Sequence, residues 1–78
     1  MQTLPPMGMT VSFPGNSAIG PCQGEVVKQY PRYRGKNEDG EFVVEDKVIL
    51  RVDERPAKWP YPDRHTFCAD VAALMPVK

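Results

Sequence analysis

The fold of this chain is decided by residues 41–52, which read EFVVEDKVILRV. Val48, Leu50 and Val52 recur at every second position, and most apolar residues of the stretch are β-branched. Alternation with a period of two is typical of a strand that has one face in a core. We therefore predict one long, bent strand over residues 41–52.

Prolines and glycines elsewhere exclude long helices. The 78 residues include nine prolines and six glycines, and a proline inside a helix removes a hydrogen bond and clashes with the preceding turn. Residues 24–30, GEVVKQY, have the composition of a strand, and Asn37 to Gly40 is a strong turn signal between the two stretches. The two stretches are predicted to form a β-hairpin with a protruding tip.

Shorter elements complete the predicted fold. Residues 10–13, 65–69 and 74–77 indicate three further strands, and Asp70 is expected to cap one helical turn over Val71 to Ala73. Five short strands in so short a chain must curl to cover their edges. We predict an all-β fold, an SH3-like five-stranded small barrel with one short 3-10 turn before the last strand.

The barrel domain is expected over residues 10–78, and residues 1–9 are expected to be a flexible N-terminal tail. A chain of this length has a small core and marginal stability. The expected core residues are Val11, Phe13, Ile19, Val26, Val44, Val48, Leu50, Val52, Phe67, Val71, Leu74 and Val77.

The charge balance limits the partners. Ten basic and ten acidic residues leave no overall field that would attract nucleic acid or an anionic membrane. No apolar run reaches the roughly 20 residues that span a bilayer, and residues 1–10 lack the pattern of a signal peptide. We expect a cytoplasmic protein with no membrane partner.

Cys22 and Cys68 are the only cysteines. Thiols in a cytosolic chain usually behave as small, buried, apolar side chains. The alternative is one disulfide between two strands, which requires a secretory route.

No set of residues indicates catalysis or metal binding. His65 is the only histidine, the chain has no glycine-rich phosphate loop or nucleophile elbow, and no serine has a base nearby in sequence. The carboxylates between Glu38 and Asp46 surround a predicted turn, where we expect them to be solvated rather than to form an acid–base pair. We predict no catalytic residue, no metal and no cofactor.

A proline-rich aromatic loop, residues 54–64, is the first candidate contact surface. Three prolines stiffen it, and Trp59 and Tyr61 are large rings of a kind that anchors protein contacts. His65 follows the loop and is included among the candidate binding residues. The alternative is that Trp59 folds back and caps one end of the barrel.

A second candidate surface lies on the first strand of the hairpin and the residues that follow it. Its members are Lys28, Tyr30, Arg32, Tyr33, Arg34 and Lys36. Residues 24–36 have four basic and one acidic residue, a net charge of +3, and residues 37–54 have two basic and seven acidic residues, a net charge of −5. Basic residues interleaved with aromatic ones can bind nucleic acid. The alternative is that opposite charges pair across the hairpin.

Short pieces between residues 13 and 74 resemble one known family. The matching residues are Phe13, Pro14, Gln23, Gly24, Glu25, Val26, Val27, Tyr30, Gly40, Phe42, Val44, Glu45, Val71, Ala72, Ala73 and Leu74. These pieces look like the plasmid-borne type II (trimethoprim-resistant) dihydrofolate reductases. The resemblance implies an SH3-like barrel, four of which form a ring around one pore that holds folate and a nicotinamide cofactor.

The active-site residues of that family are not matched. The family has Val-Gln-Ile-Tyr just before Pro-Val-Ala-Ala-Leu, and the corresponding positions here, residues 66–70, read TFCAD. A pore lysine precedes the Gln-Gly strand of the family, whereas residues 19–22 here contain no lysine. The resemblance therefore implies the scaffold and self-association through the barrel sides, and it transfers no functional residue.

These observations leave three functional hypotheses. The first is a non-enzymatic binding or assembly module that recognises a protein partner or its own copy through the aromatic loop. The second is a small oligomeric enzyme of the type II reductase kind, which pools residues of several chains at one axis. The third is a nucleic-acid-binding barrel that uses Lys28, Arg32, Arg34 and Tyr33, and the net charge of zero ranks it last.

Overall fold

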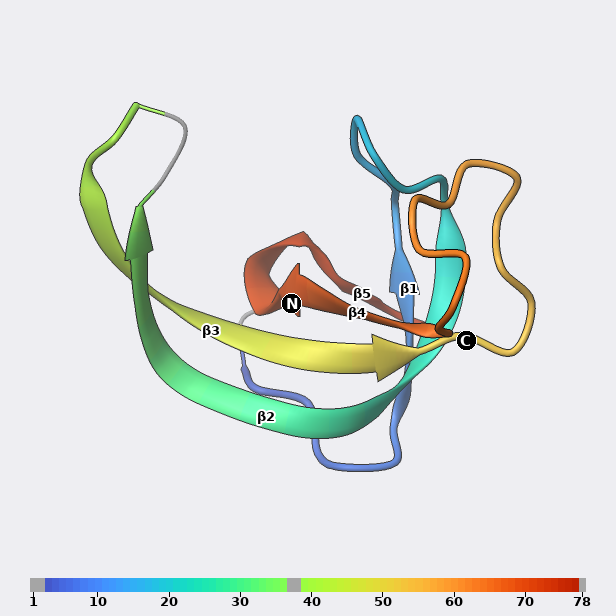
Figure 1. Ribbon diagram of the computed structural model, residues 1–78. Helices are drawn as coiled ribbons and strands as arrows, with labels where there is room; N and C mark the ends of the chain where they lie inside the picture. The colour runs from blue at the N-terminus through green and yellow to red at the C-terminus, as the bar shows by residue number, and fades with distance from the viewer. Residues whose placement is uncertain (1–2, 37–38, 78) are drawn as a thin grey trace.

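The computed structural model describes residues 3–36 and 39–77. Five strands form one antiparallel sheet in the spatial order β4-β3-β2-β1-β5 (Figure 1). The elements are β1 (Thr10–Phe13), β2 (Cys22–Lys36), β3 (Phe42–Arg51), β4 (Thr66–Asp70), the 3-10 turn η1 (Val71–Ala73) and β5 (Met75–Pro76). The all-β class, the five strands and the 3-10 turn before the last strand are confirmed. Asn37 and Glu38 of the predicted turn lie outside the described residues.

The sheet is not closed into a barrel. β4 and β5 are its two edges, and they do not pair with each other in the part of the chain that the structure describes. β1 pairs with both β2 and β5, and so joins the end of the chain to its beginning. The sheet curls through β2, which bends strongly along its length (Figure 1).

Two bulges bend β2 against β3. One extra residue of β2 follows Val26 and another lies around Arg32. At the second bulge the backbone of Arg32 is left-handed, with φ of 54°, and its N–H donates to the Asp46 carboxylate at 2.9 Å. Bulges increase the local twist. They let β2 continue past Pro31 to Lys36, beyond the predicted end of this strand at residue 30.

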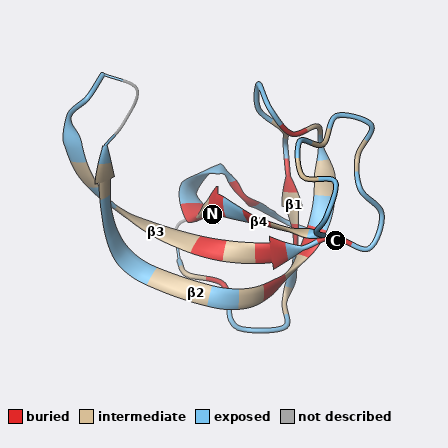
Figure 2. Cartoon of the chain, viewed as in Figure 1, coloured by how far each residue is buried: buried red, intermediate tan, exposed pale blue. Residues whose placement is uncertain are grey.

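The core lies where β1, the first half of β2, the second half of β3 and β4 meet (Figure 2). Its buried residues are Val11, Phe13, Ile19, Val26, Val48, Leu50, Val52, Phe67, Ala69, Val71 and Leu74. The predicted core is wrong at two positions. Val44 is 55 % exposed because β3 leaves the core before reaching it, and Val77 is 37 % exposed because it lies beyond the end of β5.

The segment before β1 packs along β2. Pro5 is buried, and its carbonyl oxygen accepts a hydrogen bond from the Gln29 side chain at 2.7 Å. The Gly8 N–H donates to the Val26 carbonyl at 2.8 Å, and the Val26 N–H donates to the Met9 carbonyl at 2.9 Å. Part of the segment that we expected to be a tail therefore contacts the sheet.

The predicted cap of the 3-10 turn is wrong. Asp70 directly precedes η1, but its side chain makes no hydrogen bond to the turn. Its carboxylate instead accepts a hydrogen bond from Lys47 Nζ on the neighbouring strand at 2.6 Å. A hydrogen bond between two charged groups is stronger than one to a neutral N–H, so the Asp70 carboxylate binds Lys47 rather than the N–H groups of the turn.

The outer halves of β2 and β3 form a two-stranded arm, which we define as residues 28–36 and 42–46. The arm extends away from the other strands (Figure 1). β1 pairs with β2 only at residues 22–25, and β4 pairs with β3 only at residues 47–51. Among the described residues, therefore, neither long edge of the arm has a neighbouring strand.

Candidate functional site

The arm exposes an apolar stripe on the face of β3 that is buried further along the strand, with Asp46 between the exposed and the buried residues. Phe42 and Val44 lie on the same face of β3 as the buried Val48 and Leu50, because alternate residues of a strand share a face. Phe42 is nevertheless 82 % exposed and Val44 is 55 % exposed. Figure 2 shows the change from buried to exposed positions along β3. The stripe is the part of this face that extends beyond the core.

Two basic residues border the stripe. Arg34 lies opposite Val44, and Lys36 lies opposite Phe42, so these four residues share one face, which we call the arm face. The Lys36 Nζ lies 5.1 Å from the centroid of the Phe42 ring, within the range of a cation–π contact. Arg34, Phe42, Val43 and Val44 line a shallow hollow of about 460 Å³. The arm face thus combines apolar area with positive charge.

The two tyrosines of the arm contact each other and nearby lysines. The rings of Tyr30 and Tyr33 meet edge to face, with 6.3 Å between their centroids. Lys28 Nζ lies 5.2 Å from the Tyr30 centroid, and Lys47 Nζ lies 5.7 Å from that of Tyr33. Tyr33 lies opposite Glu45 and is 49 % exposed, so it belongs to the face opposite the arm face. These rings are already in contact with cations of the same chain.

The basic side chains of β2 in the arm make no ion pair within the described parts of the chain. The ion pairs found there are Lys47–Asp70, Arg51–Glu25 and Arg51–Asp53. The register of the hairpin is the reason, because Arg34 and Lys36 lie opposite Val44 and Phe42 rather than opposite carboxylates. Among the ion pairs of residues 3–36 and 39–77, none therefore joins these basic side chains to the facing strand.

Trp59, in the aromatic loop, points inward. Its ring meets the rings of Phe67 and Tyr61 edge to face, at centroid distances of 5.7 and 5.5 Å. Its Nε1–H donates to the carbonyl oxygens of Tyr61 at 2.6 Å and Arg64 at 3.1 Å. Trp59 therefore packs against the core and fastens the loop to it.

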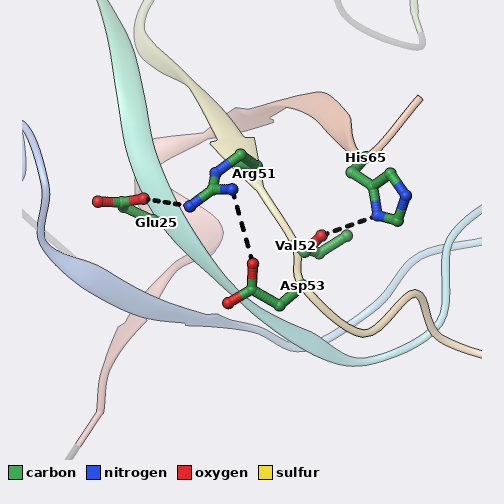
Figure 3. Close-up of polar contacts among 5 residues, drawn as sticks. All are labelled: Glu25, Arg51, Val52, Asp53 and His65. Atoms are coloured by element: carbon green, nitrogen blue, oxygen red, sulfur yellow. Dashed lines mark hydrogen bonds and ion pairs between the residues drawn. The ribbon is translucent and has the colours of Figure 1, made fainter.

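The remaining candidate residues of the loop also bind within the chain. Tyr61 is half-buried, and the Arg64 guanidinium carbon lies 4.1 Å from its ring centroid. His65 closes the base of the loop, because its Nδ1 contacts the Val52 carbonyl oxygen at 3.1 Å and its own carbonyl accepts the Val52 N–H at 2.8 Å (Figure 3). The loop is thus held in place by its own contacts.

A second hollow, of about 560 Å³, lies beside β1, β2 and the beginning of the loop. Arg51 supplies the positive charge in its lining. The guanidinium donates to the Glu25 carboxylate at 3.0 Å and lies 3.7 Å from that of Asp53 (Figure 3). Because two carboxylates neutralise Arg51 and Glu54 adds a further negative charge, this hollow does not suit an anion.

The cysteines do not form a disulfide with each other. Both are free, Cys22 is half-buried and Cys68 is exposed, so the expectation of two buried thiols is wrong. Partial burial raises the pKa of the Cys22 thiol. Within residues 3–36 and 39–77, no group of three or more histidine, cysteine or carboxylate side chains could hold a metal ion, and no helix is long and apolar enough to cross a membrane.

The hydrogen bond to Asp70 raises the pKa of Lys47. The stabilisation from this pair is present below the ordinary lysine pKa of about 10.4 and is lost as the pH rises through the higher pKa of the folded state. We expect Asp70→Asn to lower the free energy of unfolding by less than about 1 kcal/mol at pH 7 and by nothing once Lys47 is neutral. Urea unfolding of both proteins across the alkaline range measures the difference. A difference that stays constant or grows with pH would contradict this assignment.

The structure brings the predicted binding residues together in two groups at different ends of the molecule (Figure 1). Tyr30, Arg32, Tyr33 and Arg34 lie on the arm, and Trp59, Tyr61 and His65 lie in or beside the aromatic loop. Sequence reasoning missed Phe42 and assigned Val44 to the core. The sequence did contain a signal for this exposed surface. The predicted hairpin is much longer than the strands expected beside it, so those strands cannot cover its outer part.

Comparisons of this chain with protein-family models, with curated proteins and with solved structures find no match.

Proposed function

We propose that this chain is a non-enzymatic binding or assembly module for protein partners, and that the arm face is its contact surface. The observation that supports this proposal most directly is the exposure of Phe42 and Val44 on an arm that extends beyond the core. Large apolar side chains in water add nothing to the stability of a fold, and contiguous exposed apolar area marks interaction sites. Arg34 and Lys36 beside the stripe give the surface a preference for acidic partners.

We further propose that the scaffold is SH3-like, with a curled five-stranded sheet that stays open between β4 and β5 in the described part of the chain. The strand order β5-β1-β2-β3-β4, the bend of β2 and the 3-10 turn between β4 and β5 support it. The resemblance to the type II dihydrofolate reductases supports the same scaffold. A reductase activity is less well supported than a binding function, because residues 66–70 differ from the active-site strand of that family. Scaffolds of this kind serve many functions, so the contact surface must be inferred from its own residues.

The arm face is a better contact surface than the aromatic loop. The Trp59 N–H already has two acceptors, and its ring already contacts Phe67, so a partner could gain little from it. A nucleic acid is also less suitable than a protein, because the chain has no net positive charge that would attract a phosphate backbone.

The test is the double substitution Phe42→Ser with Val44→Thr. Peptides are selected from a displayed random library against the dilute wild-type protein, and their affinity for the variant is then measured. We expect a loss of at least about tenfold, because apolar anchors dominate contact surfaces, and no loss of stability beyond about 0.5 kcal/mol.

The matched control is Met75→Ser with Val77→Thr, which changes apolar residues that are 58 % and 37 % exposed on and just beyond β5. The control should bind the selected peptides as the wild type does. Equal binding to the wild type and to the Phe42→Ser, Val44→Thr variant would overturn the proposal.

A further inference from the structure

The two strands of the arm carry opposite charges. Residues 28–36 of β2 contain four basic residues and no acidic one. Residues 42–46 of β3 contain Glu45 and Asp46 and no basic residue, and Glu41 directly precedes them. The basic side chains of residues 28–36 have no ion-pair partner within the described parts of the chain. The arm is therefore a ribbon with one positive and one negative strand.

Each strand also presents a backbone edge. On β3, residues 42–46 pair with no strand on the side away from β2 within the described chain, because β4 pairs only with residues 47–51. On β2, Pro31 lacks an N–H and the bulge at Arg32 interrupts the edge, so that residues 33–36 are its regular part. Unpaired backbone groups on a strand edge are a template for another strand.

Building on the proposed function, we infer that the partner of the arm is a second copy of this chain, which adds the positive β2 edge of its arm to the negative β3 edge of the first. Charge selects this arrangement. Two β2 edges would bring Arg34 and Lys36 against their own copies, and two β3 edges would do the same for Glu45 and Asp46. Pairing β2 with β3 opposes the two signs.

The contact is head to tail. Each copy uses one edge of its arm for the copy before it and the other edge for the copy after it, so the assembly grows into a ring or an open chain rather than stopping at a two-fold dimer. Alternate side chains of the added strand lie beside Phe42 and Val44 and cover part of the exposed stripe. Such an assembly would use both the segregated charges and the apolar stripe of the arm.

The first experiment measures the mass of the wild-type protein by sedimentation as a function of concentration and salt. At about 0.02 M salt we expect the average mass to rise with concentration past that of a dimer, and at about 0.5 M salt to fall back towards that of the monomer. A wild type that stays monomeric at low salt up to about 1 mM protein, or that stops at a dimer, overturns the inference.

The second experiment inverts one edge at a time. Arg34→Glu with Lys36→Glu makes both edges acidic, and Glu41→Lys with Glu45→Lys makes both edges basic. Each variant alone should be monomeric at low salt, and an equimolar mixture should associate, because the acidic edges of one then meet the basic edges of the other. A mixture that stays monomeric, or a single variant that associates as the wild type does, overturns the inference.

A matched control separates edge charge from net charge. Arg55→Glu with Lys58→Glu changes the net charge as much as the first arm variant does, but in the aromatic loop, and it should associate as the wild type does. Equal loss of association in this control would also overturn the inference. A monomeric wild type that still binds library peptides through Phe42 would remove the second copy as partner and leave the proposed binding function standing.

Discussion

Trp59→Ala is expected to lower the free energy of unfolding by about 3 kcal/mol, a large part of the stability of so small a domain. The substitution removes a ring that packs against Phe67 and Tyr61, and the volume left behind can refill only in part. It also removes the N–H that holds the Tyr61 and Arg64 carbonyls. Urea unfolding followed by circular dichroism measures the loss.

Trp59→Phe is the matched control, because it keeps an aromatic ring against Phe67 and deletes the two hydrogen bonds. It should lose about 1 kcal/mol. If Trp59→Ala stayed within about 0.5 kcal/mol of the wild type and abolished peptide binding, Trp59 would be a contact anchor, and the aromatic loop would replace the arm as the contact surface.

Gly24→Ala is expected to lower the free energy of unfolding by about 2 kcal/mol. Gly24 is buried in β2, and an added Cβ would stand 2.9 Å from the Leu50 Cβ and 3.3 Å from the Arg51 carbonyl oxygen. Neither is the end of a flexible side chain, so β2 and β3 would have to move apart at the centre of the core. The same urea unfolding experiment measures the effect.

Gly35→Ala, on the arm, is the control for Gly24→Ala. The closest atom to an added Cβ there is on the edge of the Tyr33 ring at 3.4 Å, which is an ordinary contact distance. Alanine also restricts the unfolded chain more than glycine does, so the free energy of unfolding should be unchanged or slightly higher. A loss at Gly35 as large as the loss at Gly24 would show that the arm is packed as tightly as the core.

The strands were predictable from the sequence because period-two patterning reports which face of a strand a residue occupies. The same patterning does not report how far the core extends beneath that face. Val44 and Val48 share a face and a residue type, yet one is half-exposed and the other buried, because nothing in the described chain covers the arm. How far other segments cover this face of β3 depends on contacts between parts of the chain that are distant in sequence.

The direction of Trp59 could not be predicted for a related reason. A loop rich in prolines and aromatic residues suits both an exposed anchor and an inward cap. The choice depends on Phe67, in another strand, and on two backbone carbonyls that only the folded loop presents to the indole N–H. The basic residues of the arm, in contrast, were identifiable as candidates, because charge segregation along a hairpin is visible in the sequence itself.

The most direct test of the arm as contact surface is amide hydrogen exchange of the wild-type protein, measured with and without a saturating amount of the tightest selected peptide. We expect exchange to slow in residues 33–36 and 42–46 and to stay unchanged in residues 53–65. Slower exchange confined to residues 53–65, with the arm unaffected, would contradict the central claim that this protein makes its contacts through the arm.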